Sequence, residues 1–161
     1  MRYPFTPQRL AQLELIIDEA KKQADHAAKS GFESGSEQDG HHDEGYQLSL
    51  RETAVLDTRL RNLVDILRNA EIVVPVEQDQ QVRFGNGVEL IYKNGDASRL
   101  IVEGYVFDSA ENRLSILSPL GRAIIGAKPG DEVSFTVSGR TITVIVCKIF
   151  SPSQAEKFCS A

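Results

Sequence analysis

One short stretch of the sequence, residues 36–46, gathers side chains that could bind a metal ion. It reads SEQDGHHDEGY and holds four carboxylates and two adjacent histidines, with no lysine or arginine among them. Carboxylate oxygens are the ligands that Mg²⁺ and Ca²⁺ prefer, whereas imidazole suits transition metals. A solvated loop has the same composition. The stretch therefore predicts either a binding site for a divalent cation or an acidic turn. The choice between the two depends on the secondary structure on either side of it.

The segments on either side of this stretch have the pattern of two long helices. Apolar or small residues recur at steps of three and four before it (Leu10, Leu13, Ile17, Ala20, Ala24, Ala27) and after it (Tyr46, Ser49, Thr53, Leu56, Leu60, Leu63, Leu67, Ala70). Because a one-sided apolar stripe must be covered, we expect the helices to pair as an antiparallel hairpin with residues 36–46 at its tip. Leucine and isoleucine give way to small and polar residues toward the tip, which predicts looser packing there.

The remainder of the chain alternates as strands do. Alternating segments meet at Asn94-Gly95 and at Ser138-Gly139, which predicts two tight hairpin turns. Between them, Ser118 and Pro119 predict the start of a short helix, Gly126 its C-terminal cap and Pro129-Gly130 a turn.

The predicted fold class is α+β. We expect an N-terminal antiparallel two-helix coiled-coil hairpin over residues 1–75 and a linker over 76–81. A small antiparallel sheet domain with one short helix should follow over residues 82–150, with a C-terminal tail over 151–161.

Composition limits the class of protein. The 161 residues are 41% hydrophobic and 25% charged, as in folded soluble proteins, and no apolar run is long enough to span a membrane, so we expect a cytoplasmic protein. The net charge of -5 argues against direct binding of nucleic acid. Two cysteines are too few for a disulfide framework, and Cys147, inside an apolar run, is expected to be buried.

These features together resemble the bacterial GreA/GreB transcript cleavage factors. The resemblance is most specific in SPLGRAIIGAKPGDEV, residues 118–133, which follows the two-helix rod with its acidic tip. It implies that the sheet domain is FKBP-like and docks on RNA polymerase, while the hairpin enters the secondary channel. The tip carboxylates would then help to hold the second Mg²⁺ of the polymerase active centre. Such a factor is not itself an enzyme, has no cofactor of its own, acts as a monomer and meets nucleic acid only through the polymerase.

The resemblance also assigns roles to individual residues. Asp39, Asp43 and Glu44 would assist the polymerase metal, in a weak shared site that also contains His42. The residues expected to dock on the polymerase are Ser118, Pro119, Arg122, Lys128, Gly130 and Asp131.

The tip departs from the family pattern at one position. Aligning Tyr46 with the family's tyrosine places Asp39 on the family aspartate but His42 on the family glutamate, and neutral histidine is a poor Mg²⁺ ligand. The alternative function is therefore a channel-binding inhibitor of RNA polymerase without cleavage activity.

Two enzyme hypotheses and a nucleic-acid surface are less favoured. A metal hydrolase would use His41, His42 and Asp43, but adjacent histidines rarely face one ion. A peptidyl-prolyl isomerase needs an aromatic pocket, whereas the aromatic residues of this domain fall mostly at core positions (Phe84, Tyr92, Tyr105, Phe107, Phe135, Phe150). The basic residues of the two helices could meet RNA or the channel walls, but we interpret them as ordinary flanking positions of a hairpin seam (Lys21, Lys22, Arg51, Arg59, Arg61, Arg68).

Overall fold

The computed structural model describes residues 1–34, 44–106 and 112–158. The chain divides into two compact units, which we call the helical unit and the sheet unit. The helical unit contains Met1 and Gln8–Ala70, and the sheet unit contains Arg2–Pro7 and Glu71–Ala161. The four domain limits expected from the sequence stay a prediction.

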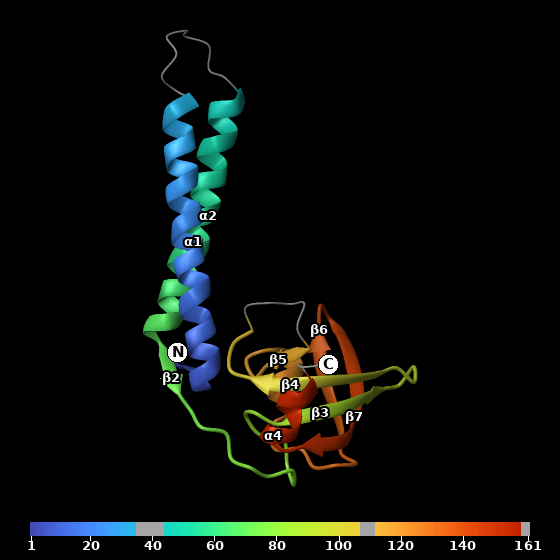
Figure 1. Cartoon of the computed structure of the whole chain (residues 1–161). Helices are drawn as coiled ribbons and strands as arrows, with labels where there is room; N and C mark the ends of the chain where they lie inside the picture. Colours follow the sequence, from blue (N-terminus) through green and yellow to red (C-terminus); the bar gives the residue numbers. More distant parts are fainter. Residues whose placement is uncertain (35–43, 107–111, 159–161) are drawn as a thin grey trace. The chain divides into compact units, whose positions relative to one another are not determined.

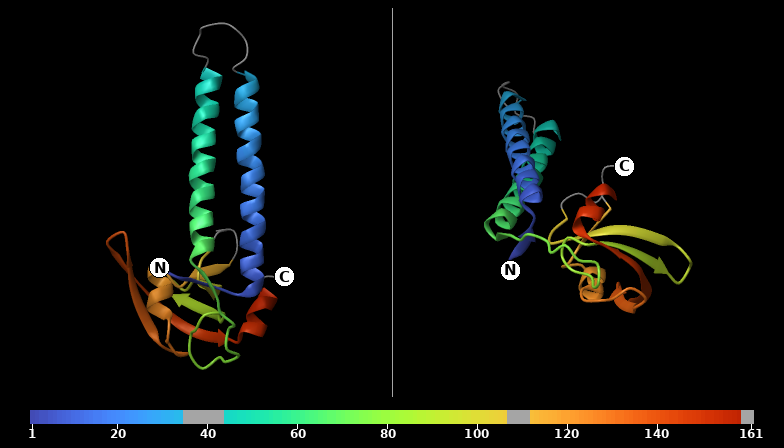
Figure 2. Two further views of the ribbon diagram at one scale, coloured as in Figure 1. Left: turned by 90° about the vertical axis from the view of Figure 1, so that its left-hand side faces the viewer. Right: turned by 60° about the horizontal axis from the view of Figure 1, so that its bottom comes forward.

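Two long helices make up the helical unit. Helix α1 spans Pro7–Ser34 and α2 spans Glu44–Arg68, so each is about 40 Å long at 1.5 Å per residue. They lie side by side and run in opposite directions (Figure 1, Figure 2). The predicted antiparallel hairpin is confirmed.

The seam between the helices is best packed near Pro7 and Arg68. Leu13, Ile17, Ala20 and Ala24 are all buried, at the predicted steps of four and three residues, and α2 buries Leu63 and Ile66. In the first half of α2, by contrast, the seam residues Ser49, Thr53 and Leu56 are only half-buried. Packing therefore loosens in the predicted direction, because alanine and threonine replace leucine along the seam.

The sheet unit is built on five strands. They are β3 (Gly87–Tyr92), β4 (Ala97–Glu103), β5 (Arg113–Ser115), β6 (Glu132–Val137) and β7 (Arg140–Phe150), in the spatial order β5-β4-β3-β7-β6. A separate two-stranded sheet pairs β1 (Tyr3–Phe5) with β2 (Ala70–Ile72). The helices of this unit are α3 (Pro119–Ile124), α4 (Pro152–Ala155) and the 3₁₀ turn η1 (Glu156–Phe158).

The sheet is antiparallel at every pair except one. Strand β5 runs parallel to β4, with Glu103 opposite Ser115. The expectation of an antiparallel sheet does not hold for this pair, because alternation in a sequence reports which face a side chain takes and not the direction of the strand.

The predicted turns are confirmed. Gly95 has φ of 88°, and Ser138 and Gly139 have φ of 51° and 76°. Two successive left-handed residues are what a type I′ hairpin turn requires, and Ser138-Gly139 joins β6 directly to β7. Gly130 also has a positive φ, of 93°, as the third residue of the Lys128–Asp131 turn.

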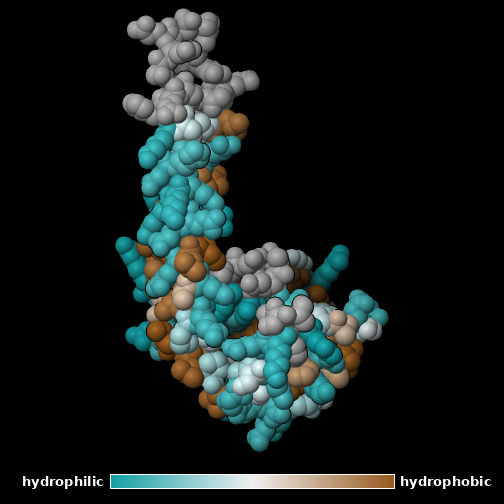
Figure 3. All heavy atoms as spheres, viewed as in Figure 1, coloured by the Kyte–Doolittle hydropathy of each residue, from teal (hydrophilic) through white to brown (hydrophobic). Residues whose placement is uncertain are grey.

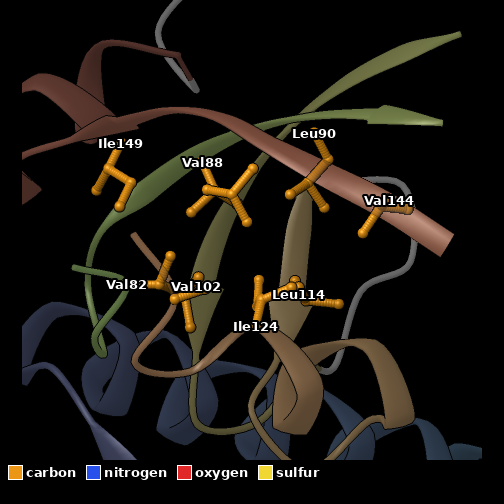
Figure 4. Packing of buried hydrophobic residues seen from close by; sticks show 10 residues of the cluster. Val82, Val88, Leu90, Val102, Leu114, Ile124, Val144 and Ile149 are labelled. Carbon is orange, nitrogen blue, oxygen red and sulfur yellow. The ribbon is translucent and has the colours of Figure 1, made fainter. Parts of the chain in front are cut away.

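The core of the sheet unit lies between one face of the sheet and α3. Figure 4 shows Val88, Leu90, Val102, Leu114, Val144 and Ile149 from four strands pointing toward Val82 and Ile124. Ile124 is the last residue of α3 and is fully buried. The apolar positions of the strands therefore meet the single apolar face of the short helix.

Cys147 is exposed, so the prediction that it is buried is wrong. Buried Val144 and Val146 set the alternation of β7, which turns Cys147 outward. The pairing with β3 shifts by one residue between Glu89 and Leu90, and this irregularity returns Ile149 to the buried side.

The segment expected to be a linker is hydrogen-bonded within the sheet unit. The Asn86 side chain is fully buried, and its Nδ2 donates to the carbonyls of Gln78 (2.5 Å) and Phe150 (2.9 Å). Its Oδ1 accepts from Gln78 Nε2 (2.9 Å) and from the Arg83 N–H (3.0 Å). The Glu77 carboxylate accepts from the N–H of Ser153 at 3.0 Å and from its hydroxyl. These bonds tie the predicted linker to the end of β7 and the start of α4.

The N-terminal strand also belongs to the sheet unit. Tyr3 meets Tyr105 edge to face, with ring centroids 5.6 Å apart, and a Cβ on Gly104 would overlap the carbonyl oxygen of Pro4. Within the described residues, no helix is long and apolar enough to cross a membrane.

Candidate functional site

Three of the four predicted metal-binding residues fall, in the sequence, between the two long helices. Helix α1 ends at Ser34 and α2 begins at Glu44, so Glu44 is the first residue of α2. Asp39, His41, His42 and Asp43 lie outside the described residues. Among the residues that are described, no cluster of three or more histidine, cysteine or acidic side chains could hold a metal ion. The tip assignment therefore stays a prediction.

The N-terminal half of α2 presents a shallow apolar hollow. Its described lining comes from Arg51, Glu52, Val55 and Leu56, and its volume is about 400 Å³. The six basic residues noted in the sequence are all exposed on the helices, where acidic residues such as Asp18 and Glu52 are interleaved with them. The face of the helical unit in Figure 3 is mostly hydrophilic with isolated apolar patches. This arrangement agrees with ordinary flanking positions of a seam.

Ser118 caps helix α3, as predicted. Its hydroxyl oxygen accepts the N–H of Gly121 at 3.0 Å, and Pro119 occupies the first helical position. A serine cap satisfies one of the free N–H groups of the first turn, while proline has no N–H to satisfy. Ser118 is therefore occupied in holding α3, and Pro119 and Arg122 are the exposed side chains that α3 offers.

The predicted turn after α3 is held by Asp131. Its Oδ2 accepts the backbone N–H of Lys128 at 2.8 Å, and its own N–H donates to the Lys128 carbonyl at 3.0 Å. Two further backbone bonds join the turn to Val146 of β7. The Gly130 N–H donates to the Val146 carbonyl at 2.7 Å, and the Val146 N–H donates to the Asp131 carbonyl at 2.9 Å. Asp131 thus shapes the turn, and the exposed Lys128 side chain is presented from a fixed backbone.

One exposed apolar residue lies between the predicted docking residues and was missed. Ile125 is 44% exposed, while its neighbour Ile124 is fully buried. The signal was present in the sequence, because two adjacent isoleucines at the end of a short helix cannot both face the same core. The exposed side chains of the segment from Pro119 to Asp131 therefore include Arg122, Ile125 and Lys128.

The described aromatic residues do not gather in one pocket. Tyr92 and Phe135 pack against the core, Tyr105 meets Tyr3, and the Lys148 ammonium lies 5.6 Å from the Phe150 ring centroid. Phe107 lies outside the described residues. These separate contacts favour a structural role over an isomerase pocket.

Comparison with known proteins gives the family. A family model described as the C-terminal part of transcription elongation factor GreA/GreB matches residues 77–150. The chain is also 30% identical over 142 residues to transcription elongation factor GreA of Acidiphilium cryptum, which covers 86% of this chain and 90% of that protein. The chain belongs to the GreA/GreB family of transcription elongation factors.

Other GreA/GreB relatives match over different lengths. Transcription elongation factor GreB of Neisseria meningitidis is 36% identical over 91 residues, or 55% of this chain and 56% of that protein. A crystal structure of GreA factor homolog 1 of Thermus thermophilus covers 92% of this chain and 99% of its own, with 24% identity and a TM-score of 0.46. Membership of the GreA/GreB family confirms the resemblance seen in the sequence, and the roles given to single residues stay predictions.

Proposed function

We propose that this GreA/GreB protein binds RNA polymerase and inserts its helical hairpin into the secondary channel to promote transcript cleavage in backtracked complexes. The antiparallel pairing of α1 with α2 supports this most directly. It brings together the helix ends at Ser34 and Glu44, away from Pro7 and Arg68, and the sequence that joins these ends contains Asp39 and Asp43. A long helical hairpin can bring carboxylates into the active centre of another protein, and it needs no pocket of its own.

The chemistry of the tip residues fits a shared magnesium site. In two-metal sites, Mg²⁺ activates a water and stabilises the leaving oxygen of a phosphodiester. Asp39, Asp43 and Glu44 would supply oxygen ligands to the polymerase ion, whereas the imidazole of His42 does not suit Mg²⁺. The protein's own part is to bring negative charge to the ion, so it acts as an accessory factor and not as an enzyme.

Docking would reside in the sheet unit. Arg122 and Lys128 are exposed cations on a backbone that Ser118 and Asp131 hold in place, with exposed Ile125 between them. Such a surface fits a partner with an apolar patch beside acidic groups. We propose that the factor binds polymerase as a cytoplasmic monomer and meets RNA only within that complex.

The second candidate function is inhibition of the polymerase through the same channel. His42 favours it, because the family's acidic residue is missing at that position. An inhibitor would occupy the channel and slow elongation without raising cleavage.

A transcript-cleavage assay on a backtracked complex tests both functions. The wild type should raise the cleavage rate, and the triple variant Asp39→Asn, Asp43→Asn, Glu44→Gln should lose this effect at unchanged affinity for polymerase. The matched control neutralises three exposed acids on the helices, Glu19→Gln, Asp25→Asn and Asp57→Asn, and should cleave like the wild type. Equal cleavage by the tip variant would refute the metal role. A wild type that slows elongation, with cleavage appearing only in His42→Glu, would identify the inhibitor.

A further inference from the structure

Several hydrogen bonds converge on Ser115, the last residue of β5. The Ser115 hydroxyl donates to the Gly104 carbonyl at 2.9 Å and accepts the Leu117 N–H at 3.1 Å. The Ser115 carbonyl accepts both the N–H (3.0 Å) and the hydroxyl (2.7 Å) of Ser118. One residue therefore joins the end of β4, the turn before α3 and the cap of α3.

Helix α3 sits directly on this residue. Gly121 is buried, and a Cβ at its position would overlap the Ser115 carbonyl oxygen. The Arg122 N–H donates to the Ser118 carbonyl at 2.9 Å. The backbone position of Arg122 is thus set through Ser118, and that of Ser118 through Ser115.

The other side of Ser115 is anchored in the sheet. Ser115 is the register partner of Glu103, and the Ile116 N–H donates to the Glu103 carbonyl at 2.7 Å. The Glu103 side chain forms an ion pair with Arg113, and both side chains are largely buried. The parallel β4–β5 pair is therefore a firm base from which Ser115 reaches α3.

We propose that Ser115 is a positioning residue that holds α3 in the orientation in which Arg122 meets RNA polymerase. This role rests on the proposed docking function, and it does not require Ser115, which is only half-buried, to touch the polymerase. Ser115 was not among the residues chosen from the sequence, because its bonds run to Gly104 and Ser118 across a register that the sequence does not show.

Loss of the Ser115 hydroxyl would lower the fraction of molecules in which α3 has the orientation for docking. Without it, the Gly104 carbonyl and the Leu117 N–H lose the partner that joins them. The Ser115 carbonyl still accepts from Ser118, so the turn before α3 is weakened and opens more often. When only a fraction of molecules is competent to bind, the apparent dissociation constant rises by the inverse of that fraction. A competent fraction of about one tenth would weaken binding about tenfold.

The first experiment compares two serine-to-alanine variants of the full chain. Ser115→Ala should bind RNA polymerase about tenfold more weakly than the wild type, and its amides over 116–122 should exchange faster while those of β3 and β7 stay protected. Ser98→Ala is the matched control on β4, because the buried Ser98 hydroxyl has no hydrogen-bond partner among the described residues. It should bind and exchange like the wild type.

A second pair isolates the hydroxyl should Ser115→Ala fail to fold. Threonine and valine have nearly the same shape and both suit a strand, so Ser115→Thr should keep wild-type affinity and Ser115→Val should lose about tenfold. Equal affinity of the threonine and valine variants, or wild-type binding by a folded Ser115→Ala, would overturn the positioning role. The wild type separates the two proposals: if it does not bind polymerase, the proposed function fails, whereas a binding wild type with an equally binding Ser115→Ala refutes the positioning role alone.

Discussion

Asn86→Asp is the sharpest test of what holds the sheet unit together. The substitution keeps the shape of a side chain that is fully buried, and it changes the hydrogen bonding and, when the new carboxyl is ionised, the charge. An ionised carboxylate cannot donate, so the carbonyls of Gln78 and Phe150 would lose the bonds of 2.5 Å and 2.9 Å that they now receive. A buried polar group left without its partner costs about 1–3 kcal/mol. Two such groups, facing a new buried charge, should lower the free energy of unfolding by about 3–5 kcal/mol at pH 7.

The loss should depend on pH in a defined direction. Burial beside two carbonyl oxygens raises the pKa of the introduced carboxyl above the value of about 3.9 that it has in the unfolded chain. A group with a raised folded pKa favours the folded state below the unfolded value and loses that contribution as pH rises through the folded pKa. The protonated acid can also donate one of the two missing bonds. We therefore expect the destabilisation to be smaller at about pH 4 than at pH 7.

Denaturant unfolding at both pH values measures this, with amide exchange in β3 and β7 as the probe specific to the sheet unit. Asn112→Asp is the control, since it makes the same chemical change at an exposed side chain of the same unit and should stay within about 0.5 kcal/mol of the wild type. A loss below about 1 kcal/mol for Asn86→Asp at pH 7, or the same loss at both pH values, would refute the reasoning.

Two further predictions concern the helical seam and the bond between Glu77 and Ser153. Leu13→Ala, at a fully buried seam position, should cost about 2–4 kcal/mol, whereas Leu15→Ala, at a side chain 69% exposed on the same helix, should cost less than about 0.5 kcal/mol in unfolding followed by the helical signal. Similar losses for both would mean that the seam is wrongly placed. The Ser153 hydroxyl, which donates to the Glu77 carboxylate, lowers the pKa of Glu77 below its ordinary value. This bond should stabilise the wild type relative to Glu77→Gln at neutral pH and lose its effect as pH falls through the lowered pKa, and a melting-temperature difference that persisted in acid would contradict it.

Features that depend on a few adjacent residues could be predicted from the sequence. Ser138-Gly139 makes a tight turn because both residues adopt left-handed conformations, and Ser118-Pro119 starts a helix because each suits its position. The seam of α1 follows from spacing alone, as buried Leu13 and Ile17 show. In each case the physical cause lies within one or two turns of the chain.

Features that depend on distant partners could not be predicted. Asn86 is a polar residue before a strand in the sequence, and only its bond to the Phe150 carbonyl shows that it joins the predicted linker to β7. Ser115 likewise gains its place from Gly104, eleven residues earlier. In the candidate docking surface, Arg122 and Lys128 could be chosen from the sequence because they are basic. The hydrogen bonds that orient their backbone could not be predicted.

The N-terminal strand has a consequence for the order of synthesis. Tyr3 and Pro4 are made before almost all of the chain, yet besides the pairing of β1 with β2 they contact Tyr105 and Gly104. About 100 residues must be added before these partners exist, which takes roughly 5–20 s at 5–20 residues per second. The helices α1 and α2 can pair during that interval, since both precede β3. On the ribosome the hairpin can therefore form, and β1 can pair with β2, before Tyr3 and Pro4 meet Tyr105 and Gly104 from the middle of the chain.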